Sequence, residues 1–115
     1  MEKQTFGRDV RIRKKKDYAA VYRQGVRRDS KHFIVITRPN QSGFSRLGVT
    51  VSKKAGGAVT RNRVKRLLRE FFRLHQTRFK PAQDIVIIAK RGMPALTYRD
   101  VRGELEGLIA TTSNA

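Results

Sequence analysis

Cysteine is absent from the sequence, so disulfide bonds and thiolate metal sites are excluded. The two histidines, His32 and His75, have no cluster of ligating side chains near them, which favours packing or surface roles. No stretch approaches the ~18 consecutive apolar residues that a membrane-spanning helix needs, and the N-terminus lacks the apolar core of a signal peptide. We therefore expect a cytoplasmic protein that does not associate with a membrane and binds no metal ion of its own.

Acidic residues are scarce: 9 Asp and Glu stand against 27 Lys and Arg, which gives a formal net charge of +18. A charge of this size predicts a polyanionic partner, and nucleic acid, an anionic membrane surface and an acidic protein are the candidates. The length of 115 residues suits one domain, residues 1–115, with frayed ends at Met1 to Gln4 and Thr111 to Ala115. Two blocks, residues 3–28 and 53–80, carry most of the positive charge.

The stretch DYAAVYRQG predicts a short helix over residues 17–25. Asp17 is a good N-cap residue, and Gly25 is the residue that best tolerates a left-handed C-terminal cap. Tyr18, Val21 and Tyr22 are spaced so that they share one face of this helix. On these residues alone, packing of both tyrosines against a sheet is favoured over a role in binding.

Two stretches rich in β-branched residues, residues 32–38 and 45–51, are separated by the turn formers PNQSGF. This pattern predicts a β-hairpin. In the second strand, large apolar residues alternate with small or polar ones: Leu47, Val49 and Val51 against Gly48, Thr50 and Ser52. One face of that strand should therefore belong to the core, while its other face is unusually small and polar.

The rest of the chain predicts a long helix, a buried strand and a last helix. The long helix begins at Thr60 or a few residues earlier and ends at about Thr77. The stretch DIVIIAK, residues 84–90, is apolar on successive positions, which indicates a strand covered on both faces with a parallel neighbour. Thr97 and Asp100 form a capping box for the final helix. The apolar side of that helix contains Val101, Leu105, Leu108 and Ile109. The order is helix, two or three strands, helix, strand, helix, which indicates an α+β fold.

The long helix separates its apolar and basic residues almost completely. At ~100° per residue, one side contains Val64, Leu67, Leu68, Phe71 and Leu74, with Phe72 at its margin. The other side contains Asn62, Lys65, Arg66, Arg69 and Arg73. Only Glu70 offsets this basic row, although like charges four residues apart destabilise a helix by a few tenths of a kcal/mol. Because Arg dominates and its planar fork suits phosphates and bases, contact with nucleic acid is favoured over a merely solvated face.

The sequence contains no visible catalytic constellation. Gly56 and Gly57 could cradle a phosphate or simply make a tight connection, and they lack the spacing of a nucleotide-binding loop. Metal-dependent phosphodiester cleavage needs converging carboxylates, yet the acids are scattered and Glu104 and Glu106 do not share a helix face. The two histidines lie on separate elements, so paired acid-base catalysis is not indicated either.

Four motifs together resemble the bacterial ribonuclease P protein component. They are RNRVKRLLRE (Arg61 to Glu70), the preceding GVTVSKKAGGAVT (Gly48 to Thr60), the later DIVIIAK, and KKKDYAAVYRQG near the N-terminus. The resemblance extends over about residues 6–109. It implies a single α+β domain with a mixed sheet of about four strands and three helices in the order α-β-β-β-α-β-α. It also implies a left-handed βαβ crossover between Gly48 and Lys90, as in the second domain of ribosomal protein S5.

The resemblance further implies a subunit of an endoribonuclease holoenzyme that removes the 5′ leader of precursor tRNA. The catalytic RNA would supply the chemistry with its own Mg²⁺, and no active site is expected on this chain. The implied partners are that RNA and precursor tRNA, with no obligate protein partner.

Two binding surfaces follow from the same resemblance. The RNA-subunit surface would contain Lys53, Lys54, Arg61, Asn62, Arg63, Lys65, Arg66, Arg69 and Arg73. The leader cleft, between the first helix and the sheet, would contain Tyr18, Tyr22 and Ile36, flanked by Phe6 and by Arg11 or Arg13. Ile36 stands where many relatives have an aromatic residue, so apolar contact rather than stacking is expected there. At Tyr18 and Tyr22, stacking with bases of any sequence is chemically sensible.

Two other functions also fit a small basic α+β protein. One is a ribosomal-type protein that only stabilises ribosomal RNA. The other is DNA binding by the Arg61 helix in a major groove, although a recognition helix normally belongs to a helix-turn-helix unit and this one lies between strands.

Overall fold

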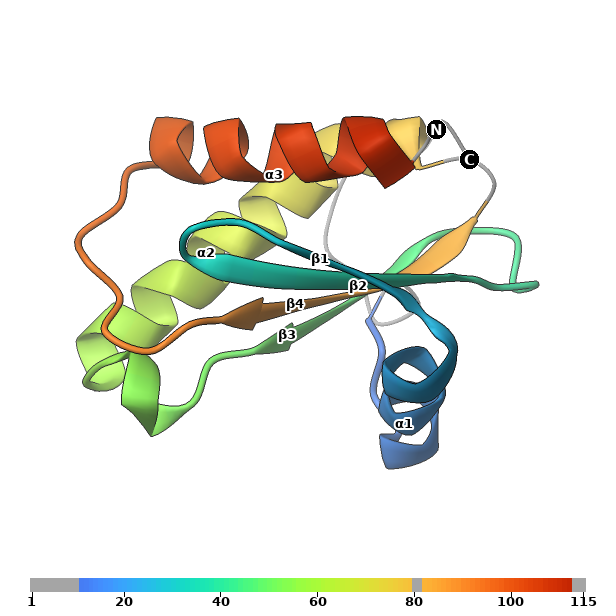
Figure 1. Cartoon of the computed structure of the whole chain (residues 1–115), viewed down its shortest axis with the longest axis horizontal. Coiled ribbons are helices and arrows are strands. Elements are labelled where there is room, and N and C mark those ends of the chain that lie inside the picture. Colours follow the sequence, from blue (N-terminus) through green and yellow to red (C-terminus); the bar gives the residue numbers. More distant parts are fainter. Residues whose placement is uncertain (1–10, 80–81, 113–115) are drawn as a thin grey trace.

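The computed structural model of the chain describes residues 11–79 and 82–112. Its helices and strands follow the order α-β-β-β-α-β-α (Figure 1). They are α1 (Lys15–Gln24), β1 (Val26–Asp29), β2 (Phe33–Pro39), β3 (Arg46–Thr50), α2 (Ala58–His75), β4 (Gln83–Ala89) and α3 (Tyr98–Thr112). Short 3-10 turns precede and follow α2, at Lys53–Ala55 and Gln76–Arg78. The expected α+β domain of three helices and a four-stranded sheet is confirmed.

The sheet is mixed, with the strand order β1-β2-β4-β3. β2 pairs antiparallel with both β1 and β4, while β3 pairs in parallel with β4. The parallel neighbour predicted for the strand at residues 84–90 is thus confirmed, and β3, α2 and β4 form a βαβ unit. The left-handed course of that crossover stays a prediction.

The hairpin predicted between residues 32–38 and 45–51 is wrong, because β4 lies between these two strands. Six of the seven residues of β4 are buried, from Gln83 to Ile87 and again at Ala89, so this strand needs covered faces and neighbours on both sides. The partner of β2 in a hairpin is instead the short strand β1.

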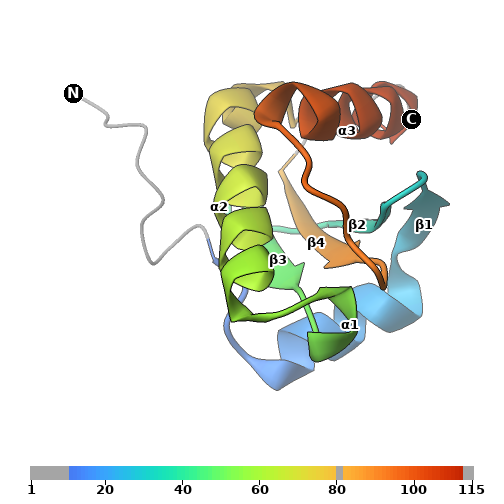
Figure 2. The same ribbon diagram turned by 90° about the vertical axis from the view of Figure 1, so that its left-hand side faces the viewer.

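One face of the sheet is covered by two helices and holds the larger core. Figures 1 and 2 both show α3 above the strands and α1 below them. The larger core contains alternate residues of the strands, such as Phe33, Leu47 and Ile87, together with Leu68 of α2 and Leu105 of α3. This core is where most of the apolar side chains of the described chain are removed from water.

The opposite face is covered only in part, by α1. A smaller core forms there from Ile12, Val21, Ile36 and Val86. Ile34 and Ile88 lie in the neighbouring row of the same face and are only partly buried. The sheet therefore has an open strip beside α1, where the apolar side chains of Ile34 and Ile88 are partly exposed.

An ion-pair network fixes α1 to the sheet. Arg46 donates from Nε and Nη2 to the two carboxylate oxygens of Asp84, each at 2.8 Å, and Asn40 donates to Asp84 Oδ1 at 2.8 Å. Asp84 is 1% exposed, and hydrogen bonding to it raises the pKa of Arg46. Arg46 Nη1 also lies 3.7 Å from Asp17 Oδ2 on α1.

Both ends of α1 differ from the prediction. The helix begins at Lys15, so Asp17 lies in the first turn and not at the N-cap. Gly25 has a φ of −82°, so its backbone is extended and not left-handed. A side chain at Gly25 is excluded by space, since a Cβ atom would lie 2.6 Å from Ile36 Cγ2 and 2.5 Å from Val21 O.

The long helix begins at Ala58 with Gly57 as its N-cap, which agrees with the earlier of the two predicted starts. Its buried face is rotated from the one predicted: Phe72 is 1% exposed, whereas Leu74 is 46% exposed. The rotation places His75 in a buried contact with α3, where its Nε2 lies 3.0 Å from Glu106. Its ring also stacks on Phe71 at a centroid distance of 4.1 Å.

The capping box of the last helix is confirmed. The Thr97 backbone N–H donates to Asp100 Oδ2 at 2.9 Å, and the Asp100 N–H donates to Thr97 Oγ1 at 3.2 Å. The first of these bonds is the main reason why the pKa of Asp100 is lowered. Among the helices of the described residues, none is both long and apolar enough to cross a bilayer.

Candidate nucleic-acid interface

The basic side of α2 lines a groove on the surface of the molecule. The groove, which we call the α2 groove, is lined by Asn62, Lys65, Arg66, Arg69, Glu70 and Arg73. Helical spacing brings these residues together, because positions three and four apart lie on one face. The five residues that the sequence placed on the basic side thus share one surface.

The single acid of the α2 groove is held by one of its arginines. Arg73 donates to Glu70 from Nε at 3.2 Å and from Nη2 at 2.8 Å. Hydrogen bonding between the two lowers the pKa of Glu70 and raises that of Arg73, so both stay charged. Among the residues that the structure describes, no ion pair occupies Lys65 or Arg66, and their charges are available to a polyanion.

The lysines before α2 are held at its N-terminal end. Lys53 and Lys54 are exposed on a 3-10 turn that Ser52 caps by accepting from the Lys54 N–H at 3.3 Å. The loop that follows β4 fixes this turn, because the Gly92 N–H donates to Lys54 O at 2.9 Å. Gly56 has a φ of 157°, which disfavours a side chain, so it makes the tight connection into α2. A phosphate-binding role for the glycines stays a prediction.

Two arginines of the RNR motif lie outside the α2 groove. Arg63 donates to Leu96 O at 2.9 Å and so connects α2 to the loop before α3. The Nε atom of Arg61 is buried and has no hydrogen-bond partner in the described residues. The structure therefore groups Asn62 with Lys65, Arg66, Arg69 and Arg73, and gives Arg63 a structural contact.

The tyrosines of α1 form an aromatic wall beside the open strip of the sheet. The rings of Tyr18 and Tyr22 are 6.3 Å apart between centroids and tilted by 41°. Tyr22 is 47% exposed, while Tyr18 is partly buried. Burial and the neighbouring Tyr22 raise the pKa of Tyr18, against the opposing effects of a Val49 backbone hydrogen bond and the positive charge of Arg69.

The apolar residues of the sheet beside α1 differ in exposure. Ile36, predicted for the leader cleft, is only 5% exposed and packs under α1. Ile34 and Ile88, which we call the cleft floor, are only partly buried, and the sequence reasoning named neither. The alternation of β2 places Ile34 on the face of Ile36, but Ile88 joins them only through the pairing with β4.

The basic residues expected to flank the cleft lie at the edge of the sheet. Arg11 bridges to Leu47 of β3, the Ile12 N–H donates to Leu47 O at 2.9 Å, and both Arg11 and Arg13 are exposed. Phe6 lies outside the described residues.

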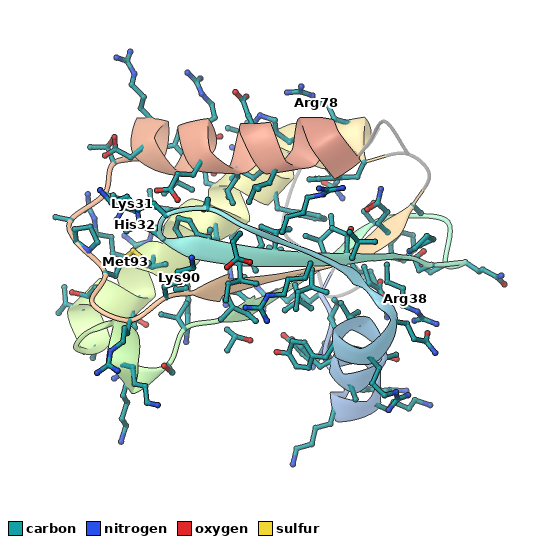
Figure 3. The ribbon with its side chains drawn as sticks, in the orientation of Figure 1. Lys31, His32, Arg38, Arg78, Lys90 and Met93 are labelled. Carbon is teal, nitrogen blue, oxygen red and sulfur yellow. The ribbon has the colours of Figure 1, made fainter. Side chains whose placement is uncertain are left out.

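Both histidines have structural partners away from the groove. Glu104 accepts from the His32 backbone N–H at 2.9 Å and from Ser30 Oγ at 2.6 Å, and it also binds the His32 ring. Figure 3 shows His32 with Lys31 and Lys90 at one end of the sheet, and Arg38 at the other end. Burial alone would raise the pKa of Glu104, but these hydrogen bonds outweigh it and lower the pKa. Within residues 11–79 and 82–112, no three ligating side chains gather into a possible metal site.

Comparison with known proteins gives a consistent result. The family model for Ribonuclease P matches residues 6–113. The chain is 50% identical over 109 residues to the ribonuclease P protein component of Syntrophus aciditrophicus, covering 95% of this chain and 92% of that protein. It is 37% identical over 108 residues to that of Clostridioides difficile, covering 93% and 95%.

Solved structures agree with these sequence relatives. The fold superposes on the RNase P protein of Staphylococcus aureus with a TM-score of 0.80 at 35% identity, covering 90% of this chain and 94% of that one. For the RNase P protein of Thermotoga maritima the TM-score is 0.78 at 30% identity, covering 88% and 96%.

Proposed function

The chain belongs to the bacterial ribonuclease P protein family, and from that premise we propose how its two surfaces divide the work of binding RNA. As the protein component it is a subunit of ribonuclease P, an endoribonuclease of tRNA processing, and it associates with the ribonuclease P RNA. In our proposal the α2 groove and the neighbouring Lys53 and Lys54 bind that RNA. The cleft beside α1 binds the single-stranded 5′ leader of precursor tRNA.

The observation that carries the proposal is the gathering of basic side chains along the α2 groove, in a chain that also presents the paired rings of Tyr18 and Tyr22 on α1. A strand of RNA needs cations along its phosphates and flat surfaces for its bases, and single-strand binding proteins combine the two. Here the α2 groove offers the cations, while Tyr18 and Tyr22 offer the aromatic surface.

The chemistry of leader removal is assigned to the RNA subunit with its Mg²⁺. In the described residues, acids such as Asp84, Glu70 and Asp100 take part in ion pairs and a helix cap. The chain would then act by lowering the repulsion between RNA phosphates, which reduces the Mg²⁺ that assembly requires. The rival reading, a recognition helix in DNA, is not supported by a helix that lies between two strands of a βαβ unit.

The cleft is tested by the difference in affinity between precursor and mature tRNA in the reconstituted holoenzyme. Replacing Tyr18 and Tyr22 by Ala should reduce precursor affinity by about tenfold or more, because stacking contributes about 1–3 kcal/mol per base. Mature tRNA, which has no leader, should bind as before. Tyr98→Phe is the matched control, since the Tyr98 hydroxyl on α3 has no hydrogen-bond partner among the described residues. Unchanged precursor affinity in the double variant would show that the leader binds elsewhere.

The α2 groove is tested by the salt dependence of binding to the RNA subunit. Arg66→Ala should weaken assembly and reduce the salt slope by about one, as expected for one lost phosphate contact. Arg99→Ala removes an exposed arginine from α3 and is the matched control. Equal effects of the two substitutions would mean that only net charge matters and that the α2 groove is no specific surface.

A further inference from the structure

Gly48 of β3 leaves a space that the ring of Tyr18 occupies. A Cβ atom built at Gly48 would lie 2.7 Å from Tyr18 Cε1 and 2.8 Å from both Cζ and Oη. These distances are shorter than real side chains tolerate, and the atoms belong to a rigid ring and not to a flexible chain end. Any residue other than glycine at position 48 must therefore move the ring of Tyr18.

The position of Gly48 in the sheet explains why the ring lies there. Gly48 is paired with Val86 of β4, which is paired with Ile36 of β2, so the three form one row across the face that α1 covers. Ile36 and Val86 are buried by α1. At the end of the row, Gly48 presents no side chain, and Tyr18 completes the apolar surface. This accounts for the small face that the alternation of β3 showed in the sequence.

The hydroxyl end of Tyr18 lies over β3, because its Oη atom would be 2.8 Å from a Cβ atom at Gly48. β3 is an edge strand of the sheet. The neighbouring ring on α1, that of Tyr22, is 6.3 Å away between centroids and 47% exposed. The Tyr18 ring is thus held between β3 and the exposed ring of Tyr22.

We propose that Gly48 is a positioning residue for RNA binding: the space it leaves on β3 holds the Tyr18 ring in place beside the ring of Tyr22. This inference rests on the proposed function, because it takes the Tyr18 ring as a stacking surface for a leader base. A ring held in advance gives up little freedom when a base stacks on it, which favours binding. Gly48 itself touches no RNA in this arrangement and acts through Tyr18.

A double-mutant cycle in the reconstituted holoenzyme tests the dependence on Tyr18. Gly48→Ala should reduce the affinity for precursor tRNA by about tenfold, within the range expected for loss of one stacked base, and leave mature tRNA binding unchanged. In the Tyr18→Ala background, Gly48→Ala should cause no further loss. Equal losses in both backgrounds would overturn the proposal. Gly103→Ala on α3, where a Cβ atom meets nothing within 4 Å, is the matched control.

The position of the ring can be measured without RNA. The chain has no Trp and three Tyr, so Tyr22→Phe with Tyr98→Phe leaves Tyr18 as the single fluorescent residue. Adding Gly48→Ala to this reporter should increase quenching of Tyr18 by acrylamide, and unchanged quenching would overturn the positioning role. Increased quenching, with full precursor affinity in both Gly48→Ala and Tyr18→Ala holoenzymes, would instead refute the leader cleft. If Gly48→Ala fails to fold, Gly48→Ala with Tyr18→Ala should restore folding, and failure to do so would also overturn the proposal.

Discussion

The two faces of the sheet differ in how completely they are covered, and this difference separates stability from binding. Among the described residues, one face is closed by α2 and α3 over a core of 17 buried residues. The other face carries α1 over a core of four, with Ile34 and Ile88 left partly exposed. A face that is fully buried has no surface left for a partner, whereas a half-covered face keeps apolar area for one.

Charge divides the two helices of the closed face. On α2 the basic side chains face outward and only Glu70 opposes them, whereas on α3 the acids Glu104 and Glu106 are engaged with His32 and His75. Acids are therefore placed where they connect elements, and basic residues are left where a polyanion can approach. The comparison teaches that like charges gathered on α2 repel one another, which disfavours the compact state, whereas the acids of α3 connect it to its neighbours.

The largest effect is expected in the larger core. Phe72→Ala should lower the free energy of unfolding by about 3–5 kcal/mol, since it opens a cavity in a fully buried cluster. Leu74→Ala, two residues later and 46% exposed, should change it by about 0.5 kcal/mol or less. Urea unfolding at fixed salt measures both. Similar losses would mean that α2 is rotated as the sequence pattern predicted.

Neighbouring isoleucines of β4 compare the two faces directly. Ile87→Ala in the larger core should lower the free energy of unfolding by about 2–4 kcal/mol. Ile88→Ala on the cleft floor should lower it by about 1 kcal/mol, because the side chain is already partly in water. Ile88→Ala should also weaken precursor tRNA binding by a few-fold in the holoenzyme. A larger stability loss at Ile88 than at Ile87 would contradict the view that the closed face of the sheet contributes more to stability than the half-covered face.

The ion-pair network that connects α1 to the sheet is expected to contribute less to the free energy of unfolding than the larger core. Arg46→Met should lower the free energy of unfolding by about 2 kcal/mol, because it leaves the carboxylate of Asp84 buried with Asn40 as its remaining side-chain partner. The partial exposure of Arg46 keeps the loss below that of a fully buried pair. Arg38→Met is the control, because Arg38 and Arg46 are both paired with Asp84 in the strand register. Equal stability of the two variants would show that the network does not hold α1.

The smallest effect is a dependence on pH at α3. The pKa of Glu104 is lowered in the folded chain from its ordinary value of 4.5, so its carboxylate stabilises the fold above that value. This contribution should disappear as the pH falls from 4.5 through the folded pKa. Glu104→Gln should therefore lose stability at pH 7 and show a shallower fall in acid, measured by urea unfolding across pH. Glu106→Gln is the control, and an unchanged acid slope in Glu104→Gln would exclude this role.

Much of the fold could be predicted from local pattern, and the failures have physical causes. The long helix, the buried strand and the Thr97–Asp100 cap were all visible because periodicity and capping are local. The hairpin was predicted wrongly because the strand that separates β2 and β3 comes 33 residues after β3 ends, at Gln83 following Thr50. The rotation of the buried face of α2 could not be predicted from the helix alone, because it involves the contact of His75 with α3.

The candidate site divides in the same way. The α2 groove was predictable, because one helix carries all of its residues. The floor of the cleft was not, because Ile34 and Ile88 come together only when β2 and β4 are in register. The need for glycine at position 48 could not be predicted either, because the space beside Gly48 is occupied by the ring of Tyr18, which belongs to another element.

The central place of β4 also bears on how the chain is made. β4 is the last of the four described strands to leave the ribosome, yet both β2 and β3 hydrogen bond to it. Until residues 83–89 emerge, β1 and β2 can pair only with each other, and β3 has no neighbouring strand. Closure of the sheet is therefore a late event that depends on contacts distant in sequence, which slows folding. The strip formed by Ile34 and Ile88 appears only in that step, because Ile34 belongs to β2 and Ile88 to β4, so a nascent chain that ends before β4 lacks it.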